Sequence, residues 1–164
     1  MAGPLAPILA SARITLQVQS TDSADAIFEV AHLLEGHPDV TDFPGFYADM
    51  LARESINPTC LGNYIALPHA RTPHVSRIVL AIGRSDSGVV FEQASQTVRL
   101  IFALGIPPAN DDGYLKVLGA LCRIIKDSAN RDALLRAPTA ANFVETLLAI
   151  EARLFGPGPA PAAR

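Results

Sequence analysis

The chain has 164 residues, which is enough for one compact domain and short for two of ordinary size. Apolar residues make up 49% and charged residues 18%, a balance that supports a buried core and excludes a disordered chain. The net charge of −3 excludes a strongly basic surface for nucleic acid or an anionic membrane, so we expect the function to reside in a local site.

The two ends of the chain are of low complexity. We expect residues 1–12 to form a flexible N-terminal arm, residues 13–155 a single folded domain, and residues 156–164 a disordered Gly/Pro/Ala tail. The longest apolar runs, 78–82 and 100–106, are far shorter than the roughly 20 residues of a membrane helix. We therefore expect a cytoplasmic protein with no membrane insertion.

The first half of the chain predicts one strand and two helices. Alternating apolar and polar residues predict a strand over 14–19, and Asp22 or Ser23 supplies the cap of a following helix. The apolar stripe of that helix consists of Ile27, Val30, Ala31 and Leu34. A second helix is expected after Pro44 and before Asn57. Its stripe consists of Phe46, Met50 and Leu51.

The second half predicts strands followed by helices. Residues 77–84 and 97–106 are rich in Val, Ile, Leu and Phe, which is typical of neighbouring strands covered on both faces. Residues 83–88 have the composition of a turn that leads into a short segment over 89–91. Helical spacing follows at Leu115, Leu118, Cys122 and Ile125, and again over 134–135 and 143–154. This order predicts a single-domain α/β fold, a three-layer α/β/α sandwich with a mixed central sheet.

The segment 61–71 carries the best candidate for chemistry. A short apolar run ends at Pro68-His69, which presents the imidazole at the end of a buried strand. A neutral imidazole has one ring nitrogen with a free lone pair, so His69 can serve as a nucleophile toward phosphorus. From the residues alone, a histidine that only packs or binds its own backbone is the alternative.

The segment also resembles the active-site motif of a known family. The matching residues are Arg53-Glu54, Pro58-Thr59, Gly62-Asn63, Ile65-Ala66-Leu67-Pro68-His69, Gly88-Val89-Val90-Phe91, Val98-Arg99-Leu100-Ile101-Phe102, Pro107, Leu115, Leu118 and Leu121. They resemble the type-2 EIIA domains of the bacterial phosphotransferase system (PTS), which comprise the fructose/mannitol and nitrogen-regulatory IIA proteins. The resemblance covers nearly the whole chain between its two ends.

The resemblance implies a histidine phosphocarrier. His69 would accept a phosphoryl group from the histidine-containing phosphocarrier protein and pass it to a IIB domain, or hold it as a signal to a regulated target protein. Arg53 would clamp two phosphoryl oxygens; without the resemblance it is an ordinary solvated helix residue. Thr59 would donate to the histidine or to the phosphoryl group, or it would only stabilise a turn.

Three positions depart from the family pattern. Tyr114 stands where most members have a second histidine, and a phenol can donate a hydrogen bond but carries no positive charge at neutral pH. Cys60 and Tyr64 replace two family glycines, which alters the surface that a partner meets. These departures keep open a second reading, a regulatory docking module of the same fold with little or no phosphotransfer.

No cofactor or metal is expected. Cys60 and Cys122 are too few for a disulfide framework and are expected as reduced thiols. Together with His69 and His74 they fit no zinc-binding spacing, and neither a dinucleotide fingerprint nor a phosphate-binding glycine loop occurs in the chain.

Overall fold

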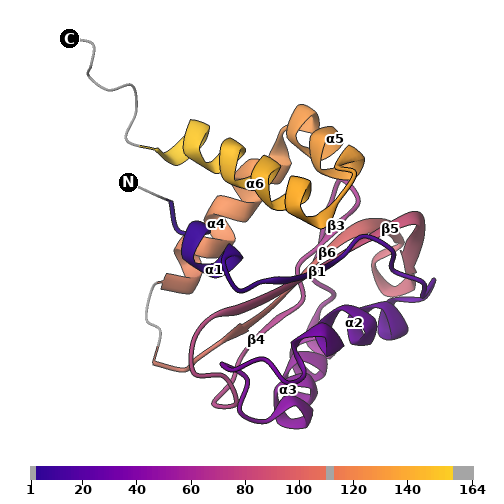
Figure 1. Cartoon of the computed structure of the whole chain (residues 1–164). Helices are drawn as coiled ribbons and strands as arrows, with labels where there is room; N and C mark the ends of the chain where they lie inside the picture. Colours follow the sequence, from indigo (N-terminus) through magenta and orange to yellow (C-terminus); the bar gives the residue numbers. More distant parts are fainter. Residues whose placement is uncertain (1–2, 110–112, 157–164) are drawn as a thin grey trace. The chain divides into compact units, whose positions relative to one another are not determined.

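The computed structural model describes residues 3–109 and 113–156. The chain is divided into two compact units (Figure 1). The sheet unit comprises residues Ser11–Asp111, and the helical unit comprises Met1–Ala10 together with Asp112–Arg164. Within the described ranges, no helix is long and apolar enough to cross a membrane.

The sheet unit contains a six-stranded mixed sheet. Its strands are β1 (Arg13–Thr15), β2 (Cys60–Gly62), β3 (Ile65–Ala66), β4 (His69–Arg71), β5 (Val79–Phe91) and β6 (Gln96–Ile106). Their order is β1-β5-β6-β3-β2, and β4 also pairs with β6. The long strands β5 and β6 are antiparallel, whereas β3 and β4 both run parallel to β6. The segment with the candidate histidine therefore lies along a central strand.

Two helices, α2 (Ser23–Ala31) and α3 (Phe43–Ile56), lie on the same side of this sheet (Figure 1). Asp22 caps α2 by accepting from the Asp25 N–H, and Asp42 caps α3 by accepting from the Gly45 N–H. Their apolar faces share one core with the strands. A Cβ at Gly83 would clash with the Val30 side chain, so the glycine permits close packing of α2 on β5. Short 3₁₀ turns, η1 (His32–Leu34) and η2 (Glu92–Ala94), complete the unit.

The helical unit contains α1 (Ala6–Leu9), α4 (Gly113–Lys126), α5 (Ser128–Arg136) and α6 (Ala140–Phe155). Within this unit α4, α5 and α6 contact one another. Leu5 is fully buried, and its N–H donates to the buried carboxylate of Glu151 at 2.6 Å. Part of the stretch expected as a flexible arm is thus ordered, whereas the expected tail beyond Gly156 lies outside the described residues.

The expected fold class, mixed α/β with a central mixed sheet, is confirmed, as is the pairing of the two apolar strands. The turn expected over 83–88 is wrong, because β5 runs through it. Residues 85–88 form a bulge opposite Arg99, in which the Ser85 hydroxyl accepts from the Gly88 N–H at 2.9 Å. The turn residues in the sequence mark this bulge, and the chain reverses after Phe91.

Two side chains assigned to apolar stripes are instead exposed. Leu115 is 56% exposed and Leu51 is 39% exposed. In α4 the buried face consists of Val117, Ala120, Leu121, Ile124 and Ile125. The predicted apolar stripe of α4 is therefore wrong at Leu115 and Cys122, because both side chains are exposed and lie outside the buried face.

Candidate functional site

His69 lies where the chain enters β4 after the gap that follows β3. The two strands pair with β6 in one continuous register, Ala66 with Ile101 and His69 with Leu104. The Leu104 N–H donates to the Pro68 carbonyl at 2.9 Å, which holds the intervening residues against the sheet. The His69 side chain is half-buried, so a rigid backbone presents an imidazole that solvent still reaches.

The hydrogen bond of His69 decides which ring nitrogen is free. Nδ1 lies 2.7 Å from the Leu67 carbonyl oxygen. A carbonyl oxygen only accepts hydrogen bonds, so Nδ1 carries the proton and donates it. In the neutral ring the lone pair is then on Nε2, the nitrogen that faces away from this bond. The backbone thus leaves Nε2 as the ring nitrogen whose lone pair is available to a reaction partner.

Arg53 lies in the last turn of α3 and is half-buried. Its Nη1 donates to the Asn57 carbonyl at 3.1 Å, across the end of the helix. Its other N–H groups have no hydrogen-bond partner within residues 3–109 and 113–156. The guanidinium therefore keeps donors available for an anion, as a phosphoryl clamp requires.

Glu54, the next residue, connects α3 to the strand of His69. Its Oε1 accepts from the Thr59 hydroxyl at 2.7 Å and its Oε2 from the Thr59 N–H at 3.2 Å. The Thr59 carbonyl in turn accepts from the Leu67 N–H at 2.9 Å. A chain of hydrogen bonds thus runs from Glu54 through Thr59 and Leu67 to His69. In this structure the single hydroxyl proton of Thr59 is directed to Glu54.

The two residues that replace family glycines lie in the β2–β3 hairpin. Cys60 is half-exposed; burial and the Glu54 carboxylate raise the pKa of its thiol to about 11. Tyr64 has a φ of 70° and its neighbour Asn63 a φ of 58°, both in the left-handed region. The Tyr64 side chain is 54% exposed. A bulky aromatic residue is thus held at the tip of the hairpin in a conformation that favours glycine.

Tyr114, the remaining predicted site residue, is the second residue of α4 and belongs to the helical unit. Its role at the site stays a prediction. Among the residues in the described ranges, no group of three or more His, Cys, Asp or Glu side chains is arranged to hold a metal ion.

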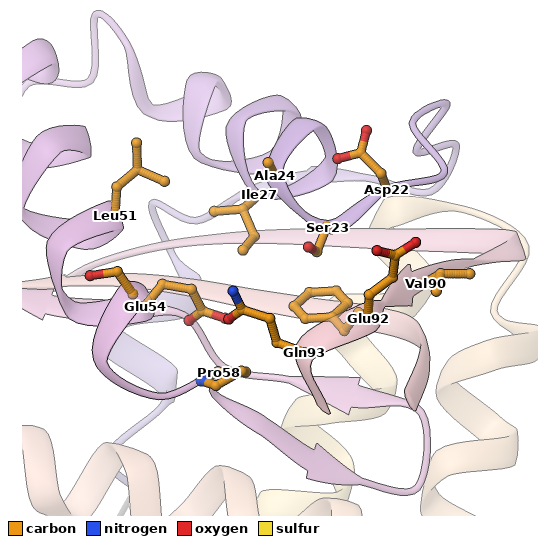
Figure 2. Close-up of a pocket in the computed structure, with 12 residues that line it drawn as sticks. Asp22, Ser23, Ala24, Ile27, Leu51, Glu54, Pro58, Val90, Glu92 and Gln93 are labelled. Atoms are coloured by element: carbon orange, nitrogen blue, oxygen red, sulfur yellow. The ribbon is translucent and has the colours of Figure 1, made fainter. Parts of the chain in front are cut away.

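A pocket of about 380 Å³ lies beside this site and shares Glu54 with it (Figure 2). Figure 2 shows Glu54 and Gln93 near its centre, with Asp22 and Glu92 at the far end. Its lining includes neither His69 nor Arg53. The His69 imidazole therefore does not line this pocket.

The role of Glu54 and the Leu67 carbonyl was not predicted from the sequence. The only feature of the sequence that points to Glu54 is its place in the matched motif, next to Arg53. The carbonyl carries no signal at all, since any residue at position 67 supplies one.

Comparison with known protein families gives one match over most of the chain. Residues 7–150 match the family described as phosphoenolpyruvate-dependent sugar phosphotransferase system, EIIA 2. All predicted site residues lie within the matched range.

Two curated relatives represent the two branches of this family. The PTS system fructose-specific EIIABC component of Bacillus subtilis is 27% identical over 141 residues, which are 85% of this chain and 22% of that protein. The chain thus spans less than a quarter of this relative's length. The nitrogen regulatory protein of Pseudomonas aeruginosa is 26% identical over 148 residues, which are 90% of this chain and 96% of that protein.

A solved structure agrees with the fold. The nitrogen regulatory protein IIA-Ntr of Neisseria meningitidis has a TM-score of 0.77 and 24% identity, and the match covers 87% of this chain and 99% of that one. This likeness supports the mixed α/β fold described above.

Proposed function

Because this chain belongs to the EIIA 2 family of the phosphoenolpyruvate-dependent sugar phosphotransferase system, we propose that it carries a phosphoryl group on Nε2 of His69. The observation that supports this best is the hydrogen bond from Nδ1 to the Leu67 carbonyl, which leaves Nε2 as the nucleophile. The donor is a histidine-containing phosphocarrier protein, and the function belongs to the cytoplasm, where phosphoenolpyruvate is made.

The transfer step exchanges one phosphorus–nitrogen bond for another. Nε2 of His69 forms a bond to phosphorus as the bond from phosphorus to the donor's imidazole nitrogen breaks, and the electron pair of that bond stays on the donor ring. Positive charge develops on the attacking ring. The Nδ1–H bond to the Leu67 carbonyl strengthens as this charge develops, so it stabilises the transition state more than the ground state.

Arg53 provides the second contribution. The transferring group carries negative charge on its oxygens, and the available N–H donors of the Arg53 guanidinium match that charge. Positioning and charge stabilisation are the main requirements of phosphoryl transfer, which needs neither metal-bound water nor an organic cofactor between two histidines. The recipient is a IIB domain or a regulated target protein.

The direct test is to incubate the protein with phosphoenolpyruvate, enzyme I and the phosphocarrier protein and to measure its mass. We expect the gain of one phosphoryl group, its loss in His69→Ala, and nitrogen chemical shifts that place it on Nε2. His32→Gln is the matched control, because His32 is an exposed histidine on the same unit. No gain of mass with an active donor would overturn the proposal and favour the docking module.

A mass gain that survives in His69→Ala would overturn the assignment of the residue. Transfer onward then separates the two recipients. A sugar-specific IIB domain that removes the phosphoryl group indicates transport, and a stable phosphoprotein with altered binding to a target indicates regulation.

A further inference from the structure

A group of polar residues on α3 and just after β4 is not used by the chemistry described above. Thr72 follows β4, is fully buried, and donates its hydroxyl proton to Oδ2 of Asp49 at 2.7 Å. The same hydroxyl accepts from the His74 N–H at 3.2 Å. The buried hydroxyl thus both donates and accepts a hydrogen bond, so its position is well defined.

His74 reinforces this link from the loop. Its Nδ1 lies 3.5 Å from Oδ2 of Asp42, and its Nε2 lies 4.0 Å from Oδ2 of Asp49. Its carbonyl accepts from both the backbone N–H and the hydroxyl of Thr41, at 2.8 Å and 3.0 Å. The loop after β4 is thus attached to the start and to the middle of α3.

The helix places the Asp49 attachment point and the clamp on one face. Asp42 precedes Asp49 by seven residues, about two turns, and Arg53 follows Asp49 by four residues, about one turn. The Asp49 and Arg53 side chains therefore leave α3 in nearly the same direction, and Asp42 caps the start of this helix. Arg53 lies about 6 Å further along the helix axis than Asp49.

The contacts also give the direction in which the helix and strand run. Asp49 contacts Thr72, and the earlier residue Asp42 contacts the later residue His74. Residue numbers along α3 fall as those along the segment after β4 rise, so the helix runs antiparallel to this segment. Continuing in the other direction leads on the helix to Arg53 and on the strand to His69, three residues or about 10 Å before Thr72.

A second attachment lies beyond Arg53 and His69. The Thr59 hydroxyl donates to Glu54 and the Leu67 N–H donates to the Thr59 carbonyl, and these bonds tie the end of α3 to the residues before His69. Arg53 and His69 are thus enclosed between two attachments of the same helix to the same stretch of chain. Sliding or tilting of α3 would have to break one of them.

We propose that the Asp49–Thr72 hydrogen bond, supported by His74, is a positioning contact that holds Arg53 in register with the phosphoryl group on His69. This inference rests on the proposed function. Thr72 acts through Arg53 and touches neither donor nor phosphoryl group. Its hydroxyl matters because a guanidinium stabilises the transferring oxygens only within hydrogen-bond distance, and a shift of about 1 Å forfeits much of that gain.

The test compares Thr72→Val with Thr72→Ser. Valine keeps the shape of the side chain and the backbone bond from the residue 72 N–H to the Ile106 carbonyl, but it removes the hydroxyl. Serine keeps the hydroxyl. We expect Thr72→Val to lower the rate constant for phosphorylation of His69 about tenfold with little change in KM for the donor, and Thr72→Ser to stay within about twofold of wild type.

Ser76→Ala is the matched control. The Ser76 hydroxyl binds Asp39 at 3.2 Å in the same loop, but it does not bind α3. We expect this variant to transfer at the wild-type rate. A loss of rate in Ser76→Ala equal to that in Thr72→Val would show a general effect of loosening the loop and would overturn the proposal.

A double-mutant cycle with Arg53 separates positioning from general stability. In an Arg53→Ala background the guanidinium is absent, so Thr72→Val should cost less than twofold. The same tenfold loss in that background would overturn the proposal, as would a wild-type rate in the single variant. If Thr72→Val fails to fold, Asp49→Ala replaces it, because Asp49 is half-exposed and its removal leaves the helix surface intact.

Phosphoramidate, a small phosphoryl donor that releases ammonia, keeps this inference separate from the proposed function. It needs the Nε2 nucleophile and the clamp but no docking of a carrier protein. If the carrier protein fails to phosphorylate the wild type, the proposed function fails. The double-mutant cycle of Thr72→Val and Arg53→Ala is then measured with phosphoramidate as the donor. Equal phosphoramidate rates for wild type and Thr72→Val would overturn the positioning role by itself.

Discussion

The Glu54 carboxylate accepts both the hydroxyl and the N–H of Thr59, at 2.7 Å and 3.2 Å. The two residues are five positions apart, and between them α3 ends and the chain turns back toward the sheet. One side chain at the end of the helix thus binds both hydrogen-bond donors of Thr59, whose carbonyl accepts from the Leu67 N–H. The helix of Arg53 and the strand of His69 are connected through this carboxylate.

Thr59→Val removes the hydroxyl from this pair and leaves the N–H in place. Because Thr59 is buried and its partner is charged, we expect the free energy of unfolding to fall by about 1–2 kcal/mol, as measured by urea denaturation. Thr59→Ser keeps the donor and should lose less than half of that amount. Equal stability of wild type and Thr59→Val would show that water replaces the hydroxyl without cost.

Arg53→Ala should slow phosphorylation of His69 and leave stability nearly unchanged. Loss of a charge-assisted contact to the phosphoryl group costs about 1.5–3 kcal/mol in the transfer step, which is roughly a 10- to 150-fold lower rate. The fold loses only the exposed bond to the Asn57 carbonyl. Timed assays of phosphoryl transfer measure the effect on the rate, and thermal unfolding measures the effect on stability. A wild-type rate, or an unfolded variant, would contradict the clamp.

Cys60 should react slowly with iodoacetamide, which attacks the thiolate. Burial and the Glu54 carboxylate raise the thiol pKa from 9.0 to about 11, so at pH 8 the thiolate population is roughly a hundredfold lower than in an unperturbed thiol. The rate should rise with pH up to about 11. A Cys122→Ser background isolates Cys60 in this assay.

Glu54→Gln tests the electrostatic part of this shift. It removes the negative charge while burial persists, so the Cys60 pKa should fall but stay above 9.0. Alkylation at pH 8 should therefore be faster in the variant than in its parent. A slower or unchanged rate would mean that burial alone sets the reactivity of this thiol.

The elements with strong periodicity or clear caps were predictable from the sequence. The Asp22 cap, the helix that ends before Asn57 and the pairing of the two apolar strands follow from short-range chemistry and are confirmed. The bulge at residues 85–88 was not predictable from the sequence, because Ser, Asp and Gly favour turns and bulges alike. Only the strand partner, Arg99, distinguishes the two.

The sequence proposes residues for the site, and this proposal stays a prediction; it does not specify their contacts. His69 and Arg53 were identified by motif, whereas the tautomer of His69 depends on a backbone carbonyl that no residue type specifies. The link between Asp49 and Thr72 joins residues 23 positions apart, and its partners have no local signature. Such contacts arise from the way α3 packs on β4, which is a tertiary property.

Tyr64→Gly should stabilise the protein. Tyr64 has a φ of 70° and its ring is 54% exposed, so the substitution relieves a strained conformation and removes little buried area. We expect a gain of about 1 kcal/mol, reduced in part by the greater freedom of glycine in the unfolded chain. Asn63→Gly, at a φ of 58°, should gain less because asparagine tolerates this region. Urea denaturation of both variants measures the difference, and a destabilised Tyr64→Gly would show that the ring packs.

Tyr114 should support transfer through its phenol. The family resemblance places it where most relatives have a second histidine, and a phenol can donate a hydrogen bond to a phosphoryl oxygen although it brings no charge. Tyr114→Phe removes only the donor and should slow phosphorylation of His69 about three- to tenfold, corresponding to one neutral hydrogen bond of roughly 0.5–1.5 kcal/mol. Tyr114→His should match or exceed the wild-type rate, because an imidazole donates and can also carry charge. Thermal unfolding of both variants is the control for the fold. Equal rates in all three proteins would contradict a role for the phenol, and a faster Phe variant would mean that the hydroxyl hinders the approach of the donor.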